Sequence, residues 1–167
     1  IRLFATLHII SAGNLSFGLP KAGGRMFFAA RRRGCNHQLW VTDGTESGTT
    51  LLKDSVSGEE IHGPASPIAL GDRLVFPGYT KYSALWVSDG TPEGTLPLRR
   101  LSGYFRPVFL GTVGEVLLFS NRDPSHGEEL WITDGTPEGT KLLRDIHPGG
   151  EDTEFGLGSV AGDRCFF

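Results

Sequence analysis

Short apolar runs recur along the chain, each directly after a turn pair that contains glycine or an acidic residue. They end at the phenylalanines of Arg25–Phe28, Arg73–Phe76, Val116–Phe119 and Arg164–Phe167. The pairs before them, such as Gly71-Asp72 and Gly114-Glu115, suit tight hairpin turns because glycine accepts positive φ. The pattern predicts antiparallel strands joined by hairpins and indicates no helix.

A second apolar run carries a tryptophan and leads into a polar loop. Leu39-Trp40-Val41, Leu85-Trp86-Val87 and Leu130-Trp131-Ile132 are each followed by Thr or Ser and then Asp-Gly-Thr. The tryptophans are roughly 46 residues apart, a spacing typical of propeller blades. Matches of this length in triplicate indicate a true internal repeat.

The strands are apolar at successive positions, where alternation would be expected of a sheet with one solvated face. Small antiparallel sheets buried on both faces and repeated at a fixed period are typical of propeller blades that pack face to face. We therefore predict an all-β protein, a β-propeller of four-stranded antiparallel blades. A stacked solenoid is the main alternative.

The repeats predict one domain over residues 1–167, or a segment of one. Their approximate bounds are 24–71, 72–114 and 115–161, with partial repeats at 1–23 and 162–167. The predicted strands fall one short of a closed four-bladed ring, and the absent strand is a tryptophan strand. We favour a segment of a larger propeller over imperfect closure or completion by a partner.

The Asp-Gly-Thr loops have an explanation that needs no ligand. Proline and glycine in Thr91-Pro92-Glu93-Gly94 suit a turn, and the preceding aspartate suits an Asx-turn. Calcium binding is the alternative, but a Ca²⁺ site needs more carboxylates than each loop offers, so we expect no metal and no cofactor. The residues assigned to structural turns are Asp43, Gly44, Gly48, Asp89, Gly90, Gly94, Asp134, Gly135 and Gly139.

The tryptophans lie in the middle of the most apolar strands. Packing in the blade core is therefore the expected role of Trp40, Trp86 and Trp131. The alternative role is sugar binding, with the three tryptophan rings exposed and stacking on carbohydrate.

Composition and charge exclude several classes of function. A net charge of -3 gives no general attraction to nucleic acid, and no apolar run is long enough for a membrane span. Cys35 and Cys165 are too few for a disulfide framework, and Cys165, matching Met26 in the repeat, is expected to be buried. The histidines lack metal-ligand spacing and no nucleophile motif occurs, so we expect no enzymatic activity.

The third repeat resembles bacterial tandem-repeat proteins of the Glu-Leu-Trp-x-Thr-Asp-Gly-Thr type. It matches through Glu129–Thr136, then Leu142–Ile146, and ends at Pro148-Gly149-Gly150. The resemblance implies propeller blades in a secreted or surface-attached bacterial protein, hence an extracellular, cell-surface or periplasmic location. It implies no catalytic residues. Repeat one departs from the pattern at 54–60 and repeat two at 96–101, where a ligand of this chain's own is most expected.

Two basic segments are candidates for partner binding. The first is Arg31-Arg32-Arg33, and the second comprises Arg99, Arg100, Tyr104 and Arg106. Arginine binds carboxylates and sulfates bidentately, although Arg99 and Arg100 could instead pair with Glu59 and Glu60. We expect a protein–protein interaction module; the alternatives are a lectin-like carbohydrate-binding module and a Ca²⁺-stabilised repeat domain of a large surface protein.

Overall fold

The computed structural model describes residues 8–9, 21–31, 36–102, 106–156 and 158–167, and these residues form strands and turns with no helix. The strands are β1 (His8–Ile9), β2 (Lys21–Ala22), β3 (Arg25–Arg31), β4 (Gln38–Thr42), β5 (Thr50–Leu51), β6 (Ile68–Leu70), β7 (Arg73–Tyr79), β8 (Ser83–Ser88), β9 (Leu96–Arg100), β10 (Phe109–Val113), β11 (Val116–Asp123), β12 (Gly127–Thr133), β13 (Lys141–Arg144), β14 (Ser159–Ala161) and β15 (Arg164–Phe166).

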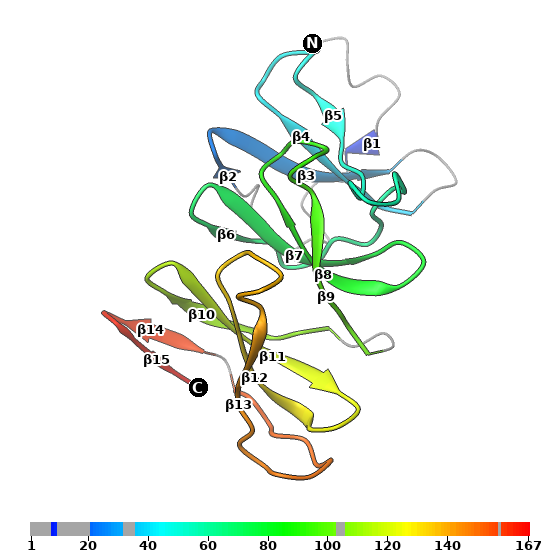
Figure 1. The fold of residues 1–167 in the computed structure, drawn as a ribbon. Helices are drawn as coiled ribbons and strands as arrows, with labels where there is room; N and C mark the ends of the chain where they lie inside the picture. Colours follow the sequence, from blue (N-terminus) through cyan, green and yellow to red (C-terminus); the bar gives the residue numbers. More distant parts are fainter. Residues whose placement is uncertain (1–7, 10–20, 32–35, 103–105, 157) are drawn as a thin grey trace.

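The strands form antiparallel sheets that repeat one order. Sheet one has the order β1-β3-β4-β5, with β2 also paired to β3; sheet two is β6-β7-β8-β9 and sheet three is β10-β11-β12-β13. A C-terminal hairpin, β14–β15, follows. Figure 1 shows the sheets succeeding one another in chain order, with the hairpin beside β10. The predicted all-β, antiparallel architecture is confirmed.

A tight hairpin turn joins β2 to β3, β6 to β7, β10 to β11 and β14 to β15. The first turn residue is glycine, with a φ of 56° at Gly23, 58° at Gly71, 59° at Gly114 and 62° at Gly162. Positive φ at this position matches the right-handed twist of the strands, as in the primed turns of hairpins. The sequence pattern located these turns because this conformation favours glycine.

Sheet two is buried on both faces. On one face, Leu74, Phe76 and Trp86 join a hydrophobic cluster with Phe27, Val41 and Leu52 of sheet one. On the other face, Val75, Leu85 and Val87 join a cluster with Leu117, Phe119 and Trp131 of sheet three. Neighbouring strand residues point to opposite faces, which explains why the strand sequences are apolar at successive positions.

The tryptophans differ in burial because they lie on one face of each sheet. Trp86 is fully buried against sheet one and Trp131 is 3% exposed against sheet two. Trp40 is half-buried, on the face of sheet one that points away from sheet two, where it stacks on Phe28. Cys165, expected to be buried, is half-buried in β15, with its sulfur 3.6 Å from the Leu110 carbonyl oxygen.

Replacing Trp86 by alanine is expected to lower the free energy of unfolding by about 3–5 kcal/mol, because it opens a cavity between two sheets. Trp40→Ala serves as the matched control, and its loss should be smaller because the ring is half-buried. Urea unfolding followed by circular dichroism measures both. Equal losses would contradict the packing of sheet one on sheet two around Trp86.

Candidate functional sites: the repeat loops and a polar pocket

The Asp-Gly-Thr loop is a closed network of hydrogen bonds. Asp89 Oδ1 accepts from the backbone N–H of Thr91 at 2.8 Å and from its hydroxyl at 2.7 Å. The Thr91 hydroxyl oxygen accepts from the Gly94 N–H at 3.0 Å, and the Thr95 hydroxyl donates to the Thr91 carbonyl at 2.6 Å. A Cβ atom at Gly94 would collide with the Asp89 carboxylate, which explains this glycine. The loop is an Asx-turn reinforced by threonine hydroxyls.

The other two loops repeat the same bonds. Asp43 Oδ1 accepts from Thr45 and Asp134 Oδ1 accepts from Thr136, in each case from both the N–H and the hydroxyl. The threonine hydroxyl and N–H hold the pKa of each carboxyl below its usual value. Within the described ranges, no group of three or more His, Cys, Asp or Glu side chains is placed to hold a metal ion.

An arginine from one sheet binds the loop of the next. Arg25 Nη1 donates to the Asp89 carbonyl oxygen at 2.9 Å, and Arg73 Nη1 donates to the Gly135 carbonyl oxygen at 3.1 Å. Gly90 leaves room for this side chain, since a Cβ there would lie 2.8 Å from Arg25 Cδ. Sequence reasoning did not select these arginines, although they occupy the same repeat position. The same position is Val116 in sheet three and Arg164 in the hairpin.

Buried Glu129, the glutamate before Leu-Trp, organises a loop. Its carboxylate accepts from the N–H groups of Ile146 at 2.7 Å and His147 at 3.1 Å, and from the Thr153 hydroxyl at 2.8 Å. Burial raises the pKa of this carboxyl, but these hydrogen bonds outweigh burial and hold the pKa below its ordinary value of 4.5. The glutamate of the repeat pattern therefore has a structural role here. At the same position, Gln38 instead donates to the Glu60 carboxylate.

The candidate arginines of repeat two do not form one site. Arg99 lies 3.9 Å over the Trp131 ring, and its Nη2 atom is 3.9 Å from Asp123 Oδ2. Arg100 lies 4.1 Å over the Tyr82 ring, on the opposite face of β9. Arg106 is exposed and lines a hollow of about 130 Å³ with Tyr79. Neither Arg99 nor Arg100 pairs with Glu59 or Glu60.

The remaining basic candidates are described only in part. Arg31 ends β3, where its backbone pairs with His8 of β1. Arg32, Arg33 and Tyr104 lie outside the described residues. The predicted role of these residues in partner binding stays a prediction.

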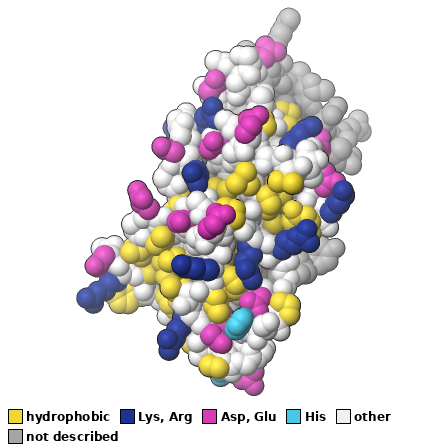
Figure 2. All heavy atoms as spheres, viewed as in Figure 1, with side chains coloured by type: hydrophobic (Ala, Val, Ile, Leu, Met, Phe, Trp, Pro, Cys, Tyr) yellow, Lys and Arg dark blue, Asp and Glu magenta, His cyan; other side chains and the backbone are white. Residues whose placement is uncertain are grey.

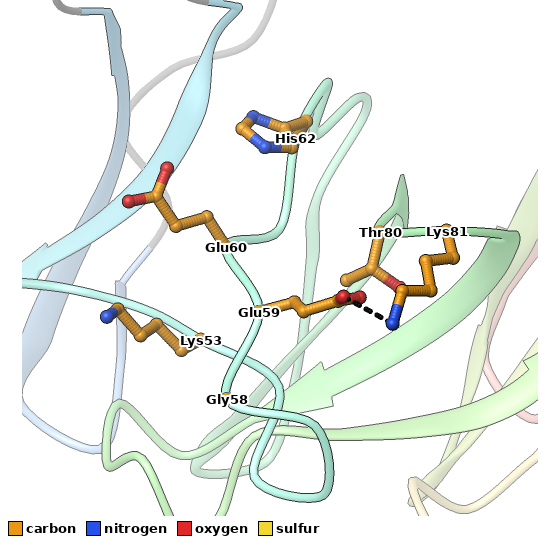
Figure 3. Close-up of a pocket in the computed structure, with 7 residues that line it drawn as sticks. All are labelled: Lys53, Gly58, Glu59, Glu60, His62, Thr80 and Lys81. Atoms are coloured by element: carbon orange, nitrogen blue, oxygen red, sulfur yellow. Dashed lines mark ion pairs between the residues drawn. The ribbon is translucent and has the colours of Figure 1, made fainter.

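A polar pocket of about 480 Å³ lies where repeat one departs from its pattern. Figure 3 shows its lining, which comprises Lys53, Gly58, Glu59, Glu60, His62, Thr80 and Lys81. Glu59 forms an ion pair with Lys81 at 2.8 Å, and Glu60 accepts from Gln38. The lining has two lysines and two glutamates, so these charges balance, and it has no phenylalanine, tyrosine or tryptophan. The pocket can hold a small polar molecule, whereas it offers no sugar-stacking surface.

A carboxylate–imidazole pair lies at the end of β11 and the start of β12. Asp123 Oδ1 accepts from the backbone N–H groups of Ser125 and His126, and it lies 2.9 Å from His126 Nδ1. Burial raises the pKa of Asp123, but these hydrogen bonds outweigh it and lower the pKa. Ser125 contributes its backbone N–H to this group, so Asp123 shapes the turn.

Comparison with known proteins gave no match: no family model, no curated protein and no solved structure resembles the chain significantly.

Replacing Arg73 by methionine is expected to lower the free energy of unfolding by about 1–2 kcal/mol, because the Gly135 carbonyl loses its donor while the apolar stem is kept. Arg164→Met is the matched control, since Arg164 has the same repeat position and is exposed like Arg73, but its side chain forms no hydrogen bond with another described residue. Chemical denaturation measures both variants. An effect of equal size in Arg164→Met would refute the inter-sheet hydrogen bond as the cause.

Glu129→Gln is expected to make the free energy of unfolding depend less on pH between pH 7 and pH 3. The folded pKa of Glu129 lies below its unfolded value, so the carboxylate stabilises the fold above about pH 4.5 and this contribution is lost as pH falls through the folded pKa. The variant should be less stable at pH 7 and should lose less stability on acidification. Thermal melts from pH 7 to pH 3 test this, with exposed Glu138→Gln as the control. Parallel curves for Glu129→Gln and the parent would contradict it.

Proposed function

We propose that the chain is a non-enzymatic scaffold of β-propeller blades that serves protein–protein interaction in an extracellular or envelope assembly. The observation that carries the proposal is a set of exposed apolar side chains within residues 143–167, together with repeat loops whose polar groups are hydrogen-bonded within the loop. The location rests on the resemblance of the repeats to those of bacterial surface proteins.

The burial of sheet two supports the propeller. Both of its faces pack on neighbouring sheets of the same strand order, as blades do. Arg25 and Arg73 hold the same repeat position, and each donates to a neighbouring carbonyl of the next sheet's Asp-Gly-Thr loop, so the two sheet-to-sheet contacts are similar. A propeller, or a segment of one, requires that each sheet packs on the next in the same way.

The exposed apolar side chains within residues 143–167 support a protein partner. Leu143, Ile146, Val160, Phe166 and Phe167 are between 43% and 55% exposed. Figure 2 shows hydrophobic side chains at the surface over the part of the molecule where β10, β14 and β15 lie. Aromatic and aliphatic side chains of this kind form the centres of protein interfaces.

The alternatives receive less support. A sugar ladder would need accessible rings, but Trp86 and Trp131 are buried between sheets. Calcium would need further ligands around the aspartates, and each aspartate already binds its own threonine. No helix in the described part of the chain is long and apolar enough to cross a membrane.

Cross-linking of the whole chain in an extract of its native host, followed by mass spectrometry, tests the function. We expect a defined protein to be captured by the parent and lost with Val160→Asp, because the variant places an unpaired charge on the exposed apolar surface. Val56→Asp is the matched control, since Val56 is 82% exposed and far along the chain. A glycan array runs in parallel. Two results together would favour a lectin: binding to specific glycans on the array, and protein capture that is the same for the parent and Val160→Asp.

A further inference from the structure

The polar pocket is built on the segment between β5 and β6, which the backbone holds from two sides. The His62 N–H donates to the Tyr79 carbonyl oxygen at 2.8 Å, and the Tyr79 N–H donates back at 3.0 Å. His62 also lies opposite Gln38 of β4, and Lys53 lies opposite Glu60, both in antiparallel register. Residues directly opposite in such a register place their side chains on the same face. The register therefore brings polar side chains of separate strands together.

Gln38 is a buried amide with one unused acceptor beside the pocket. It is 2% exposed and its Nε2 atom donates to the Glu60 carboxylate, which lines the pocket. Because an ionised carboxylate only accepts hydrogen bonds, this contact fixes which way the amide points. The Gln38 Oε1 atom then has no hydrogen-bond partner among the described residues. A buried acceptor without a donor is destabilising, so a donor supplied by a ligand is favoured here.

Sheet three shows what the same repeat position binds elsewhere in the chain. There, the Glu129 carboxylate accepts from two backbone N–H groups and one hydroxyl of the loop that follows β13. In sheet one, the corresponding segment instead brings the Glu60 carboxylate against Gln38. Sheet one therefore gathers acceptors where sheet three supplies donors. A ligand group with several N–H donors complements this arrangement.

The charged side chains of the lining divide into a closed pair and an open pair. Glu59 and Lys81 form an ion pair at 2.8 Å, whereas Lys53 and Glu60 form no ion pair with a described residue. Figure 3 shows that Glu59 and Glu60 point in opposite directions, with Glu59 toward Lys81. A ligand with one charge of each sign satisfies both open side chains and leaves no net charge in the pocket. A ligand with a single charge satisfies only one of them.

Two further polar atoms of the lining are buried without a partner in the described part of the chain. They are His62 Nδ1 and Thr80 Oγ1. The imidazole nitrogen accepts in the tautomer that carries its proton on Nε2, and the hydroxyl both donates and accepts. These atoms favour a ligand whose own side chain is short and polar.

We propose that this pocket binds a small polar α-amino acid in its zwitterionic form. The ammonium group donates to the Glu60 carboxylate and to the Gln38 amide oxygen, and the ligand carboxylate pairs with Lys53. The hydroxyl or amide of the ligand side chain binds Thr80. The volume of about 480 Å³ accommodates a molecule of this size. The site goes beyond the proposed protein interaction, since its residues lie outside 143–167, and either proposal can fail alone.

Calorimetry of the 167-residue chain with L-serine tests the proposal. Two analogues each lack one of its charges: ethanolamine has no carboxylate and β-hydroxypropanoate has no ammonium group. We expect saturable binding of L-serine and at least about ten-fold weaker binding of each analogue, because each loses one charge-assisted contact. Slower hydrogen exchange in residues 59–63 on addition of L-serine locates the site.

Variants assign the two ends of the ligand. Glu60→Gln and Lys53→Gln should each weaken L-serine binding at least about ten-fold, because each removes the charge that binds one end of the ligand. Glu93→Gln and Lys141→Gln are the matched controls, since both side chains are exposed and lie outside the pocket. The controls should bind L-serine as the parent does. Circular dichroism verifies that each variant is folded.

Several results would overturn the proposal. They are no saturable binding of L-serine, L-threonine or L-asparagine, binding of either analogue as tight as that of L-serine, and an L-serine affinity that both pocket variants leave unchanged. The first two results come from the unaltered chain, so they decide the matter even where a variant does not fold. Binding of ethanolamine equal to that of L-serine would assign the pocket to amines instead.

Discussion

The structure depends on the burial of sheet two between two other sheets. Each of its strands places side chains on alternate faces, so both sets must be apolar for the sheet to lose contact with water on both sides. Trp86 and Phe76 pack on one neighbour and Val75 and Leu85 on the other. A sheet of this composition is stable only between neighbours.

The polar residues of the repeat also help to hold neighbouring sheets together. Asp89, Thr91 and Thr95 satisfy one another within a single turn, and Arg25 joins that turn to the previous sheet. Since their hydrogen-bonding groups are used in this way, the most regular residues of the sequence are the least available to a ligand. A ligand is better accommodated where the repeat changes, at the polar pocket, or at the exposed apolar side chains within residues 143–167.

The two places offer different chemistry. The pocket has balanced charges, with Glu59 already paired to Lys81, so it suits a small polar ligand. The exposed apolar side chains suit a protein surface instead.

The sequence by itself determined the strands, their hairpins and the internal Asp-Gly-Thr turns, because these depend on local chemistry: positive φ at glycine, short polar side chains and strand periodicity. It also indicated that both faces of the sheets are buried. Only the tertiary structure decided that Arg99 and Arg100 lie on opposite faces, that Trp40 is half-buried, and that Arg25 reaches Asp89. The pocket likewise combines the segment between β5 and β6, which carries Glu59, with the turn between β7 and β8, which carries Lys81. Such relations depend on how separate sheets pack, and no local pattern encodes them.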